Sequence, residues 1–456
     1  MKSIETMKLG HMRLEGFVTR PDANLNQLKL AVIGLGQAGG KMAQEFARLG
    51  VDVLAINTAK SDLDDLTMIE KENKILLGSI GGASKDIRVG RQAILDNQAL
   101  VAEVLQRDKI VDADFVFVIA GLGGGTGNGG LPTVIRALNK IRAHKSYKGN
   151  PTNGVIVSVP GNWEKRGLKK NAVAGLSAIK ALIDTQKVGS VLIVDNEKLA
   201  NDFTEINRKL YEHTVEWEAY GNMTIASTIF ELMVATSLPQ VNSFDKSEFI
   251  DVFSTPGFIT IGKQKLEDRE INEQELERTV VRSFTQSNIF ADGYTFDTEA
   301  KIGAFVVIRP VNQIITTEHK TLIESVMNSI LRGANITHYG LINNNVWGTT
   351  HKNDPKEKIA ILYSLAVVED LPERVIELIK TIELEEQAIE EAKEQKKKRS
   401  LDLSGYLEMY QKDEVAATTE SYSTKDLFDD DDLFSGKKNS VEKKSAKDLF
   451  ADDDDL

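Results

Sequence analysis

The sequence contains one unusually glycine-rich stretch, Gly121-Leu122-Gly123-Gly124-Gly125-Thr126-Gly127-Asn128-Gly129-Gly130, in which seven of ten residues are glycine. It follows the apolar run 113–120, which predicts a buried strand, and precedes the segment 131–138, which predicts a helix. Glycine loses more conformational freedom on folding than any other residue, so an ordinary loop rarely contains so many. Without Cβ atoms, successive N–H groups can close on an anion at a helix N-terminus. The stretch therefore predicts a phosphate-binding loop rather than a flexible linker.

The composition is that of an ordinary globular protein. The 456 residues are 41% apolar and 27% charged, and this length predicts two or three domains. A formal charge of -12 argues against direct binding of the chain to DNA. The absence of cysteine excludes disulfides and thiolate metal sites and is typical of a reducing compartment, here the cytoplasm. The histidines show no ligand spacing, so we predict structural or surface roles for them and no metal-binding residue: His11, His144, His213, His319, His338 and His351.

No part of the sequence predicts a membrane segment. It contains no run of about 18 apolar residues, the length that a membrane span needs. Residues 1–26 lack the apolar core of a signal peptide, and we expect a short helical extension there.

The first half of the chain alternates apolar strand patterns with helical patterns. Such alternation predicts parallel strands joined by right-handed crossovers, which is a doubly wound α/β sheet. Ligands of these sheets bind beyond the carboxyl ends of the strands, so the loops after the strands should converge on one crevice. The six predicted strands are 28–33, 51–56, 74–77, 113–120, 154–159 and 191–194.

The second half predicts a buried connecting helix followed by a smaller α/β domain. Residues 222–236 have helical length and are apolar on most sides, which predicts burial, and Pro239 marks the end of the helix. Beyond it, predicted strands alternate with amphipathic helices: strands at 258–262, 302–309 and 359–368, and helices at 273–285 and 318–331.

The C-terminal region predicts a long helix and then a disordered acidic tail. Residues 371–399 are amphipathic and end in four basic residues, 396–399, an order that suits the helix dipole. This basic end is either a solvated helix end or a contact for DNA, a membrane or the tail. From about residue 413 the composition is typical of disorder. The run Lys425-Asp426-Leu427-Phe428 recurs as Lys447-Asp448-Leu449-Phe450, each before acidic residues, so we favour a repeated linear motif for a basic partner over a merely solubilising segment.

A second glycine loop follows the first predicted strand. Residues 34–39 read Gly-Leu-Gly-Gln-Ala-Gly and satisfy the GxGxxG pattern, so NAD binding is one hypothesis. Against it, the second strand ends in Asn57 where a ribose-binding acid is expected, and the loop 121–130 stays unexplained. The P-loop pattern fails as well, because position 42 is methionine. Two such loops facing one crevice suit a nucleotide with several phosphates.

Residues 120–132 resemble the GGGTGTG signature of the tubulin/FtsZ family, and the resemblance extends over about residues 28–370. It implies a GTPase that binds GTP or GDP with Mg²⁺. The C-terminal helix, without an FtsZ-like D-x-P-x-F-L-R anchor, is most similar to the TubZ and phage tubulin branch. We therefore divide the chain into an N-terminal extension (1–27), a GTP-binding domain (28–221), a central helix (222–240), an activation domain (241–370), a C-terminal helix (371–412) and the tail (413–456).

The resemblance also implies which residues bind the nucleotide. Ala59 stands where FtsZ usually has Asp, and Leu168 stands where FtsZ has an arginine at the ribose. Arg166 or Lys169 is the candidate to replace that arginine, and Tyr220 or Trp217 is the candidate to stack on the base. The full set is Gly36, Gln37, Ala38 and Gly39 in the first loop; Asn57 and Thr58 in the second; Gly82, Ala83 and Ser84 at the γ-phosphate; Gly121, Gly123, Gly124, Gly125, Thr126, Gly127 and Asn128 in the signature; Glu164 and Arg166 at the ribose; and Asn196, Tyr220 and Asn222 at the base.

The catalytic residues are implied by a segment after the central helix. Residues 242–249 resemble the α-tubulin segment N-x-D-x-x-E-F, with one extra residue after Asn242. The resemblance implies that Asp245 and Glu248 enter the nucleotide site of the neighbouring subunit and polarise the attacking water, with Asp251 as the alternative to Asp245. Phosphoryl transfer needs such positioning more than covalent chemistry. The other interpretation is that these acids are solvated surface charges.

These observations predict a GTPase that polymerises head to tail and hydrolyses GTP to GDP and phosphate at subunit junctions. The branch resemblance implies a role in plasmid or phage DNA segregation, with a DNA-bound adaptor protein as partner of the C-terminal region and with no membrane partner. The alternatives are an FtsZ-like cell-division filament protein and a GTP-dependent adaptor that does not polymerise.

Overall fold

The computed structural model describes most of the chain between Leu28 and Arg399. The predicted N-terminal extension, residues 400–412 and the predicted disordered tail lie outside the described residues. The described part of the chain divides into two units at Lys380 and Thr381, inside the last helix. The described residues are 28–78, 81–210, 216–237, 240–242, 244–266, 273–285, 290–291, 293–296, 298–309, 317–343 and 360–399.

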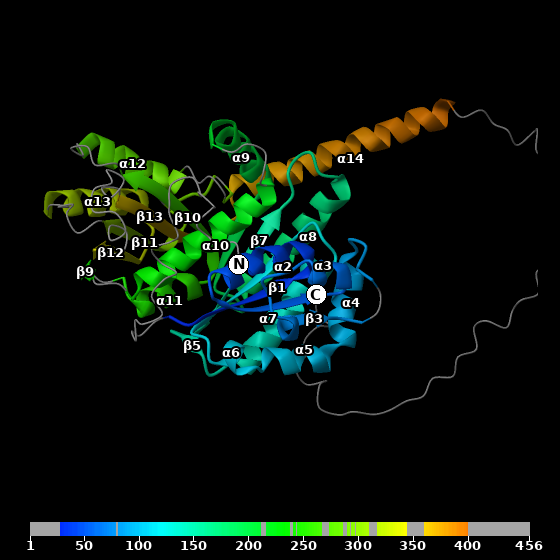
Figure 1. The fold of residues 1–456 in the computed structure, drawn as a ribbon. Helices are drawn as coiled ribbons and strands as arrows, with labels where there is room; N and C mark the ends of the chain where they lie inside the picture. The colour runs from blue at the N-terminus through cyan, green and yellow to red at the C-terminus, as the bar shows by residue number, and fades with distance from the viewer. Residues whose placement is uncertain are drawn as a thin grey trace, which may run out of the picture. The chain divides into compact units, whose positions relative to one another are not determined.

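A parallel sheet of six strands forms the first half of the first unit (Figure 1), as the sequence predicts. The strands lie in the order β3-β2-β1-β4-β7-β8, and every neighbouring pair is parallel. All residues of β1, β4 and β8 are buried, because helices cover both faces of the sheet. The bounds are β1 Leu30–Leu35, β2 Asp52–Asn57, β3 Lys74–Leu76, β4 Phe115–Gly121, β7 Asn153–Val159 and β8 Ser190–Asp195.

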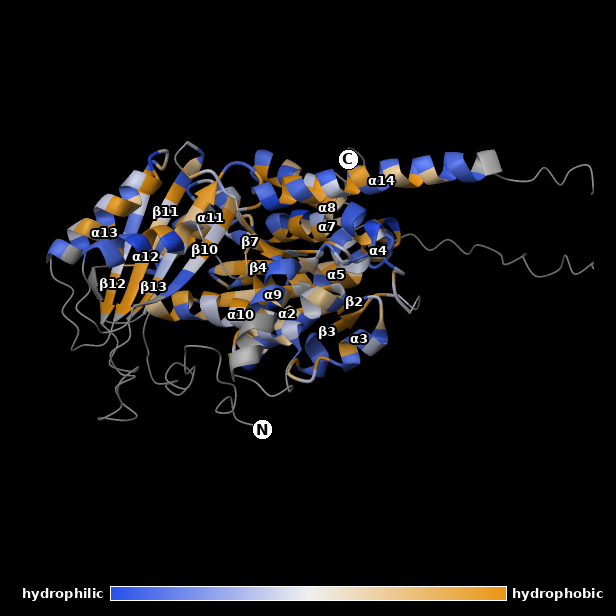
Figure 2. Ribbon diagram, turned by 90° about the horizontal axis from the view of Figure 1, so that it is seen from above, coloured by the Kyte–Doolittle hydropathy of each residue, from blue (hydrophilic) through white to orange (hydrophobic). Residues whose placement is uncertain are grey.

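The helices of this half lie in two layers, one on each face of the sheet. The helices α2 and α10 pack together on one face, and α4, α7 and α8 form the layer on the other (Figure 2). The bounds are α2 Gly36–Arg48, α3 Lys60–Asp64, η2 Lys71–Asn73, α4 Ile87–Asp96, α5 Gln98–Leu105, α6 Asp108–Val111, α7 Thr126–Ile141, α8 Arg166–Asp184, α9 Asn196–Leu210 and α10 Trp217–Ala235.

The second half is an α/β domain whose strands continue the same sheet. The strand β10 pairs with the edge strand β8 through Gly257↔Ser190 and Phe258↔Val191, so the exposed edge of β8 is covered. Beyond β10 the order is β13-β11-β12-β9, with antiparallel and parallel pairs mixed. The bounds are β9 Gln240–Asn242, α11 Lys246–Ser254, β10 Gly257–Leu266, α12 Glu273–Thr285, β11 Ala300–Arg309, α13 Thr317–Ile330, β12 Ile336–Asn343, β13 Ala360–Val368 and α14 Glu373–Arg399.

Three strands of the structure are absent from the sequence prediction, besides the short β9. The strand β12 contains Thr337, His338 and Tyr339 in its first half, so it lacks the apolar run of the predicted strands. The other two, β5 (Ser146–Tyr147) and β6 (Asn150–Pro151), form a hairpin of two-residue strands. Its turn residues Lys148 and Gly149 have φ values of 50° and 85°, as a type I′ turn requires. These strands owe their existence to their pairing partners rather than to a local pattern.

The central helix α10 joins the two halves through a buried carboxylate. Glu231 is fully buried and accepts a hydrogen bond from the Tyr363 hydroxyl of β13. The Lys263 Nζ of β10 lies 2.8 Å from the same oxygen, Oε2. Burial and the Glu231 charge raise the pKa of Tyr363 well above its usual value, so the phenol stays protonated and donates.

The layer of α4 and α7 depends on glycines at the helix crossing. A Cβ atom at Gly129 would lie 2.0 Å from the carbonyl oxygen of Ile87, and one at Gly90 would lie 2.1 Å from that of Gly125. Backbone cannot yield as a flexible side chain does, so only glycine allows these helices to approach so closely.

We predict that Gly129→Ala destabilises the protein by about 1–3 kcal/mol, the usual cost of forcing an extra methyl group into a packed interior. The matched control is Gly167→Ala in α8, where an added Cβ would have nothing within 4 Å. That change should stabilise the protein by up to about 1 kcal/mol through helix propensity. Denaturant unfolding measures both, and an unchanged midpoint for Gly129→Ala would contradict the close-packing explanation.

Candidate functional site

The loop after β1 lies directly against the glycine-rich loop after β4. Gly36 has a φ of +69° and is the first residue of α2, which begins directly after the last residue of β1. A Cβ at Gly36 would lie 2.9 Å from the Gly127 nitrogen, and one at Gly127 would lie 2.6 Å from the Leu35 oxygen. The first turns of α2 and α7 are therefore adjacent. Each first turn carries N–H groups without intrahelical acceptors and the positive end of a helix dipole, so the pair is suited to an anion.

Only part of the glycine-rich loop is open to a ligand. A Cβ at Gly123 or Gly124 would meet its nearest neighbour at 3.4 Å or 3.6 Å, so there is room at these two positions. The open backbone of Gly123 and Gly124, together with the two helix starts, fits a phosphate group. The other five glycines would place a Cβ within 3.0 Å of a neighbouring atom and serve close packing: Gly121, Gly125, Gly127, Gly129 and Gly130.

The first-loop candidates Gln37, Ala38 and Gly39 are not equally exposed to solvent. Gln37 and Ala38 are exposed, whereas Gly39 is buried against β4, where an added Cβ would lie 2.2 Å from the Ile119 oxygen. Gly39 therefore sets the position of α2, and Gln37 and Ala38 present the accessible surface of this loop.

The loop after β2 contacts the glycine-rich loop through a pair of hydroxyl groups. The Oγ1 atoms of Thr58 and Thr126 are 2.7 Å apart and both residues are buried. The Asn57 side chain instead shapes its own loop: Oδ1 accepts from the Thr58 N–H at 2.8 Å, and Nδ2 donates to Asp62 at 3.0 Å. Thr58 thus links the two loops, and Asn57 fixes the backbone that positions it.

The loop after β3 has an unusual backbone. Gly81, Gly82, Ser84 and Lys85 all have positive φ, at 71°, 126°, 47° and 64°. Ser84 and Lys85 are not glycine, and each such residue costs about 1–2 kcal/mol. An added Cβ at Gly81 would meet nothing within 4 Å, which leaves the backbone there accessible. Left-handed residues in succession can turn their N–H groups toward one point, which suits an anion.

Two asparagines lock these loops together. The Asn128 Nδ2 donates to the carbonyls of Leu122 and Asn171, both at 2.7 Å. The Asn171 Nδ2 donates to the carbonyls of Lys85 at 2.8 Å and Gly123 at 3.1 Å. Asn128 is only 3% exposed, so it holds the loop rather than offering a side chain to a ligand. Sequence reasoning missed Asn171, which lies inside α8 and has no motif around it.

The loops after β7 and β8 contact each other. Glu164 Oε1 accepts from the Gly161 N–H at 3.1 Å and from the Asn196 Nδ2 at 3.3 Å, which brings the two predicted residues together. Arg374 at the start of α14 braces both loops: its Nε donates to Asp195 Oδ2 at 2.9 Å, and its Nη2 donates to the Pro160 oxygen at 3.3 Å. Burial raises the pKa of Asp195, and the Arg374 charge opposes that rise.

The alternative ribose and base candidates differ in exposure and in contacts. Lys169 is only 1% exposed, whereas Arg166 opens α8 and is partly exposed. The Tyr220 hydroxyl donates to Asp202 at 3.3 Å, and its ring packs on Phe203, so Tyr220 already contacts α9. The aromatic surface beside the ribose loop comes instead from Trp217, whose ring centroid is 6.1 Å from that of Trp163, and Trp163 is 55% exposed. Asn222 is half-buried in the second turn of α10.

The predicted catalytic carboxylates lie at the opposite end of the sheet. Lys246 Nζ in α11 is 2.7 Å from Asp114, which directly precedes β4, and Lys148 Nζ in the β5–β6 turn is 2.8 Å from Asp251. β4 has seven residues. At about 3.3 Å per residue, its two ends are about 20 Å apart. The structure therefore does not bring Asp245, Glu248 and Asp251 to the phosphate-binding loops of their own chain.

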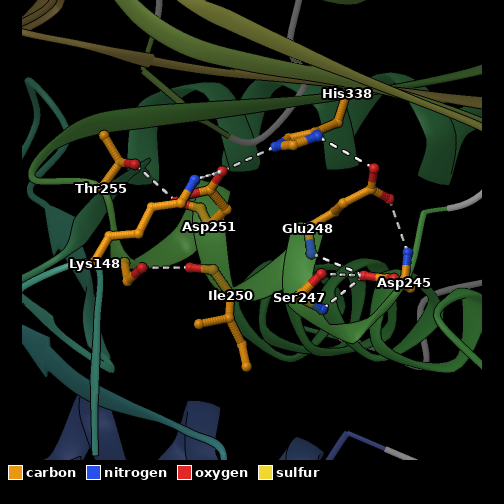
Figure 3. Close-up of polar contacts among 9 residues, drawn as sticks. Lys148, Asp245, Ser247, Glu248, Ile250, Asp251, Thr255 and His338 are labelled. Atoms are coloured by element: carbon orange, nitrogen blue, oxygen red, sulfur yellow. Dashed lines mark hydrogen bonds and ion pairs between the residues drawn. The ribbon is translucent and has the colours of Figure 1, made fainter.

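Asp245 and Glu248 form a capping box at the start of α11 (Figure 3). Asp245 Oδ1 accepts from the N–H groups of Ser247 and Glu248 at 2.8 and 3.1 Å, and the Asp245 N–H donates to Glu248 Oε2 at 2.9 Å. Burial tends to raise the pKa of Asp245, but hydrogen bonds from Ser247 and from the Glu248 N–H outweigh it and lower that pKa. Burial raises the pKa of Glu248, against the hydrogen bond from Asp245 and the charge of His338.

His338 of β12 completes this cluster. Its Nδ1 lies 3.3 Å from Glu248 Oε1, and its Nε2 lies 3.1 Å from Asp251 Oδ2 (Figure 3). Asp245 is exposed, whereas Asp251 is only 6% exposed. The histidine is 87 residues from Asp251 in the chain, so ligand spacing in the sequence carries no signal of this contact.

The described residues contain no group of three or more histidine, aspartate and glutamate side chains arranged to hold a metal ion. None of their helices has both the length and the apolar character needed to cross a membrane.

Comparison with known proteins gives two family matches and several relatives. Residues 29–204 match the GTPase domain of the tubulin/FtsZ family, and residues 231–379 match the TubZ-like C-terminal domain. The tubulin-like protein TubZ of Bacillus cereus is 25% identical over 387 residues, which are 78% of this chain and 82% of that protein. In structure, the chain is similar to a GTPγS-form protofilament of Bacillus thuringiensis serovar israelensis TubZ (21% identity, TM-score 0.64, 83% of this chain and 97% of that one). It is also similar to a type III plasmid segregation TubZ (22% identity, TM-score 0.62, 83% and 96%).

We predict that Arg374→Leu destabilises the protein by about 3–5 kcal/mol at neutral pH, because it leaves a buried carboxylate without its partner. Without the arginine the pKa of Asp195 rises further. The loss should therefore shrink as the pH falls and Asp195 becomes protonated. Urea unfolding at pH 7 and pH 5 measures this, and the double variant Arg374→Leu/Asp195→Asn should recover part of the loss. A loss that is equal at both pH values would contradict the ion-pair explanation.

Proposed function

Because the chain belongs to the tubulin/FtsZ family and carries a TubZ-like second domain, we propose that it binds GTP, assembles head to tail into filaments and hydrolyses GTP between subunits. The phosphates would lie at the starts of α2 and α7, against Gly123 and Gly124 and the loop 81–85. The guanine end would lie toward Asn196, Asn222 and the Trp163–Trp217 pair.

One observation carries the proposal. The phosphate-binding loops follow the carboxyl ends of the parallel strands, whereas α11, with Asp245 and Glu248, lies at their amino ends. A chain cannot bring the two together by itself. A second copy stacked in the same direction presents its amino end to the carboxyl end of the first, and repetition of this heterologous contact grows a filament.

At such a junction GTP hydrolysis would depend on charged groups that are held in position beside the γ-phosphate. Asp245 is exposed and its lowered pKa keeps it ionised near neutral pH, so it can orient a water molecule toward the γ-phosphate of the neighbouring subunit. Glu248 lies beside it on the same helix turn and would share this role. Asp251 is buried and paired, so it supports the cluster rather than reaching a neighbour. Mg²⁺, held mainly by phosphate oxygens and water, would neutralise charge on the phosphates.

The biological role that we propose is segregation of plasmid or phage DNA, through an adaptor protein that binds the DNA and the C-terminal region. Support comes from the TubZ-like second domain and from the TubZ relatives, one of them described as a plasmid segregation protein. The formal charge of -12 is consistent with an adaptor rather than direct contact with DNA. The TubZ-like second domain favours this role over FtsZ-like cell division.

We predict that the protein pellets as a polymer when GTP is added. The pellet should dissolve as GTP is consumed and should persist with a non-hydrolysable analogue, because hydrolysis at the junctions releases the subunits. Sedimentation with GTP, GDP and the analogue over a wide range of protein concentration measures this. If no nucleotide-dependent polymer forms at any concentration, the protein is a GTP-dependent adaptor that does not polymerise.

We also predict that Asp245→Ala and Glu248→Ala each leave GTP binding intact and lower turnover by about 10²-fold or more, as removal of a transition-state contact does. Their filaments should be over-stable, because GTP stays unhydrolysed. Phosphate release and nucleotide affinity measure the two effects. The matched control is Asp96→Ala, an exposed carboxylate at the end of α4, which should behave as wild type. Normal turnover in both variants would remove Asp245 and Glu248 from the mechanism.

A further inference from the structure

His338 occupies a position that the proposed mechanism leaves unused. It projects from β12 between two carboxylates of α11, and each of its ring nitrogens faces one of them (Figure 3). The side chain is 14% exposed, so it is largely removed from solvent.

We propose that His338 is a positioning residue for GTP hydrolysis, which holds the Glu248 carboxylate in the orientation needed at the neighbouring subunit. This proposal rests on the proposed function of Glu248 at the subunit junction. His338 itself touches no reacting group.

The contacts of Glu248 support this role. Its Oε2 accepts from the Asp245 N–H at 2.9 Å, and its Oε1 lies 3.3 Å from His338 Nδ1. The two carboxylate oxygens are thus held from two different elements, the start of α11 and the strand β12. A free glutamate side chain samples many rotamers, and a group that must orient water works best when its rotamer is fixed.

His338 is in turn anchored from its far side. Asp251 Oδ2 lies 3.1 Å from His338 Nε2 and 2.8 Å from Lys148 Nζ, so one buried oxygen contacts two side-chain nitrogens. Lys148 sits in the tight β5–β6 turn, which belongs to the first half of the unit. The chain Lys148–Asp251–His338–Glu248 therefore ties the carboxylate to the amino edge of the parallel sheet.

The helix itself does not need His338 for anchoring. Phe249 and Phe253 are fully buried, stack at a centroid distance of 4.4 Å and pack on Phe115 of β4. The capping box closes the first turn of α11. Loss of the histidine should consequently change the orientation of Glu248 more than the position of the helix.

Histidine chemistry makes the arrangement sensitive to protonation. A neutral imidazole has one N–H donor and can donate to Glu248 or to Asp251, whereas an imidazolium donates to both. The charged groups that face the ring are Glu248 and Asp251 from α11 and Lys148 behind Asp251, with Asp245 beside Glu248.

Two isosteric variants test the proposal. In His338→Asn the amide nitrogen takes the place of Nδ1 and can still donate to Glu248; in His338→Gln it takes the place of Nε2 and reaches Asp251 instead. We predict that His338→Gln lowers turnover per polymerised subunit by roughly 10-fold to 100-fold, the range known for outer-shell partners of functional side chains. His338→Asn should keep most of the turnover, because it can still donate to Glu248. The affinity for GTP should not change in either variant.

The matched control is Thr337→Ala, one residue away on the opposite face of β12, where the hydroxyl meets Asn328. It should turn over as wild type. Turnover is normalised to the subunits that pellet with GTP but not with GDP, so aggregated protein is not counted. Equal losses in the Asn and Gln variants would indicate a merely structural histidine and overturn the proposal, as would wild-type turnover in both. If Glu248→Ala is inactive while both His338 variants are normal, the role of His338 is refuted and the proposed function stands. If Glu248→Ala is fully active, the proposed function of Glu248 itself is refuted.

Discussion

The direction of the parallel strands is the constraint on which the candidate site depends. Parallel strands place all of their carboxyl ends at one edge, where the loops of β1, β2, β3 and β4 contact one another through glycine backbone and threonine hydroxyls. The same geometry sends α11 to the other edge, where Lys246 meets Asp114. A site that needs both edges is incomplete in a single chain, so under the proposed function the strand direction alone would link hydrolysis to assembly.

Buried charged side chains hold the two halves of the first unit in place relative to each other. Arg374 joins Asp195 and the Pro160 carbonyl, so the start of α14 braces two loops of the candidate nucleotide site. Glu231 in the central helix meets Tyr363 and Lys263 from two strands of the second half. A displacement of the second half would break charged contacts that are costly to leave unpaired in the interior.

Much of the fold could be predicted from local pattern. Each of the six parallel strands coincides with an apolar run, and the helices α12 and α13 of the second half lie where their periodicity predicts. The helix α11 was not predicted from its pattern. The strand β12 could not be predicted, because Thr337, His338 and Tyr339 show no alternation, and it forms only through pairing with β11. The roles of single glycines could not be predicted from the sequence either. An added Cβ would fit at Gly124, whereas at Gly129 it would clash with the backbone of the crossing helix α4.

The sequence by itself determined the α/β class, the positions of the glycine-rich loops and the family resemblance, because these depend on short runs of neighbouring residues. Only the tertiary structure decided that Asp245 is exposed while Asp251 is buried, that Arg374 braces the loop after β7 and that His338 lies between two carboxylates. The physical reason is distance along the chain. Contacts such as that of His338 with Asp251, 87 residues apart, arise from strand pairing and helix packing, which no local pattern records.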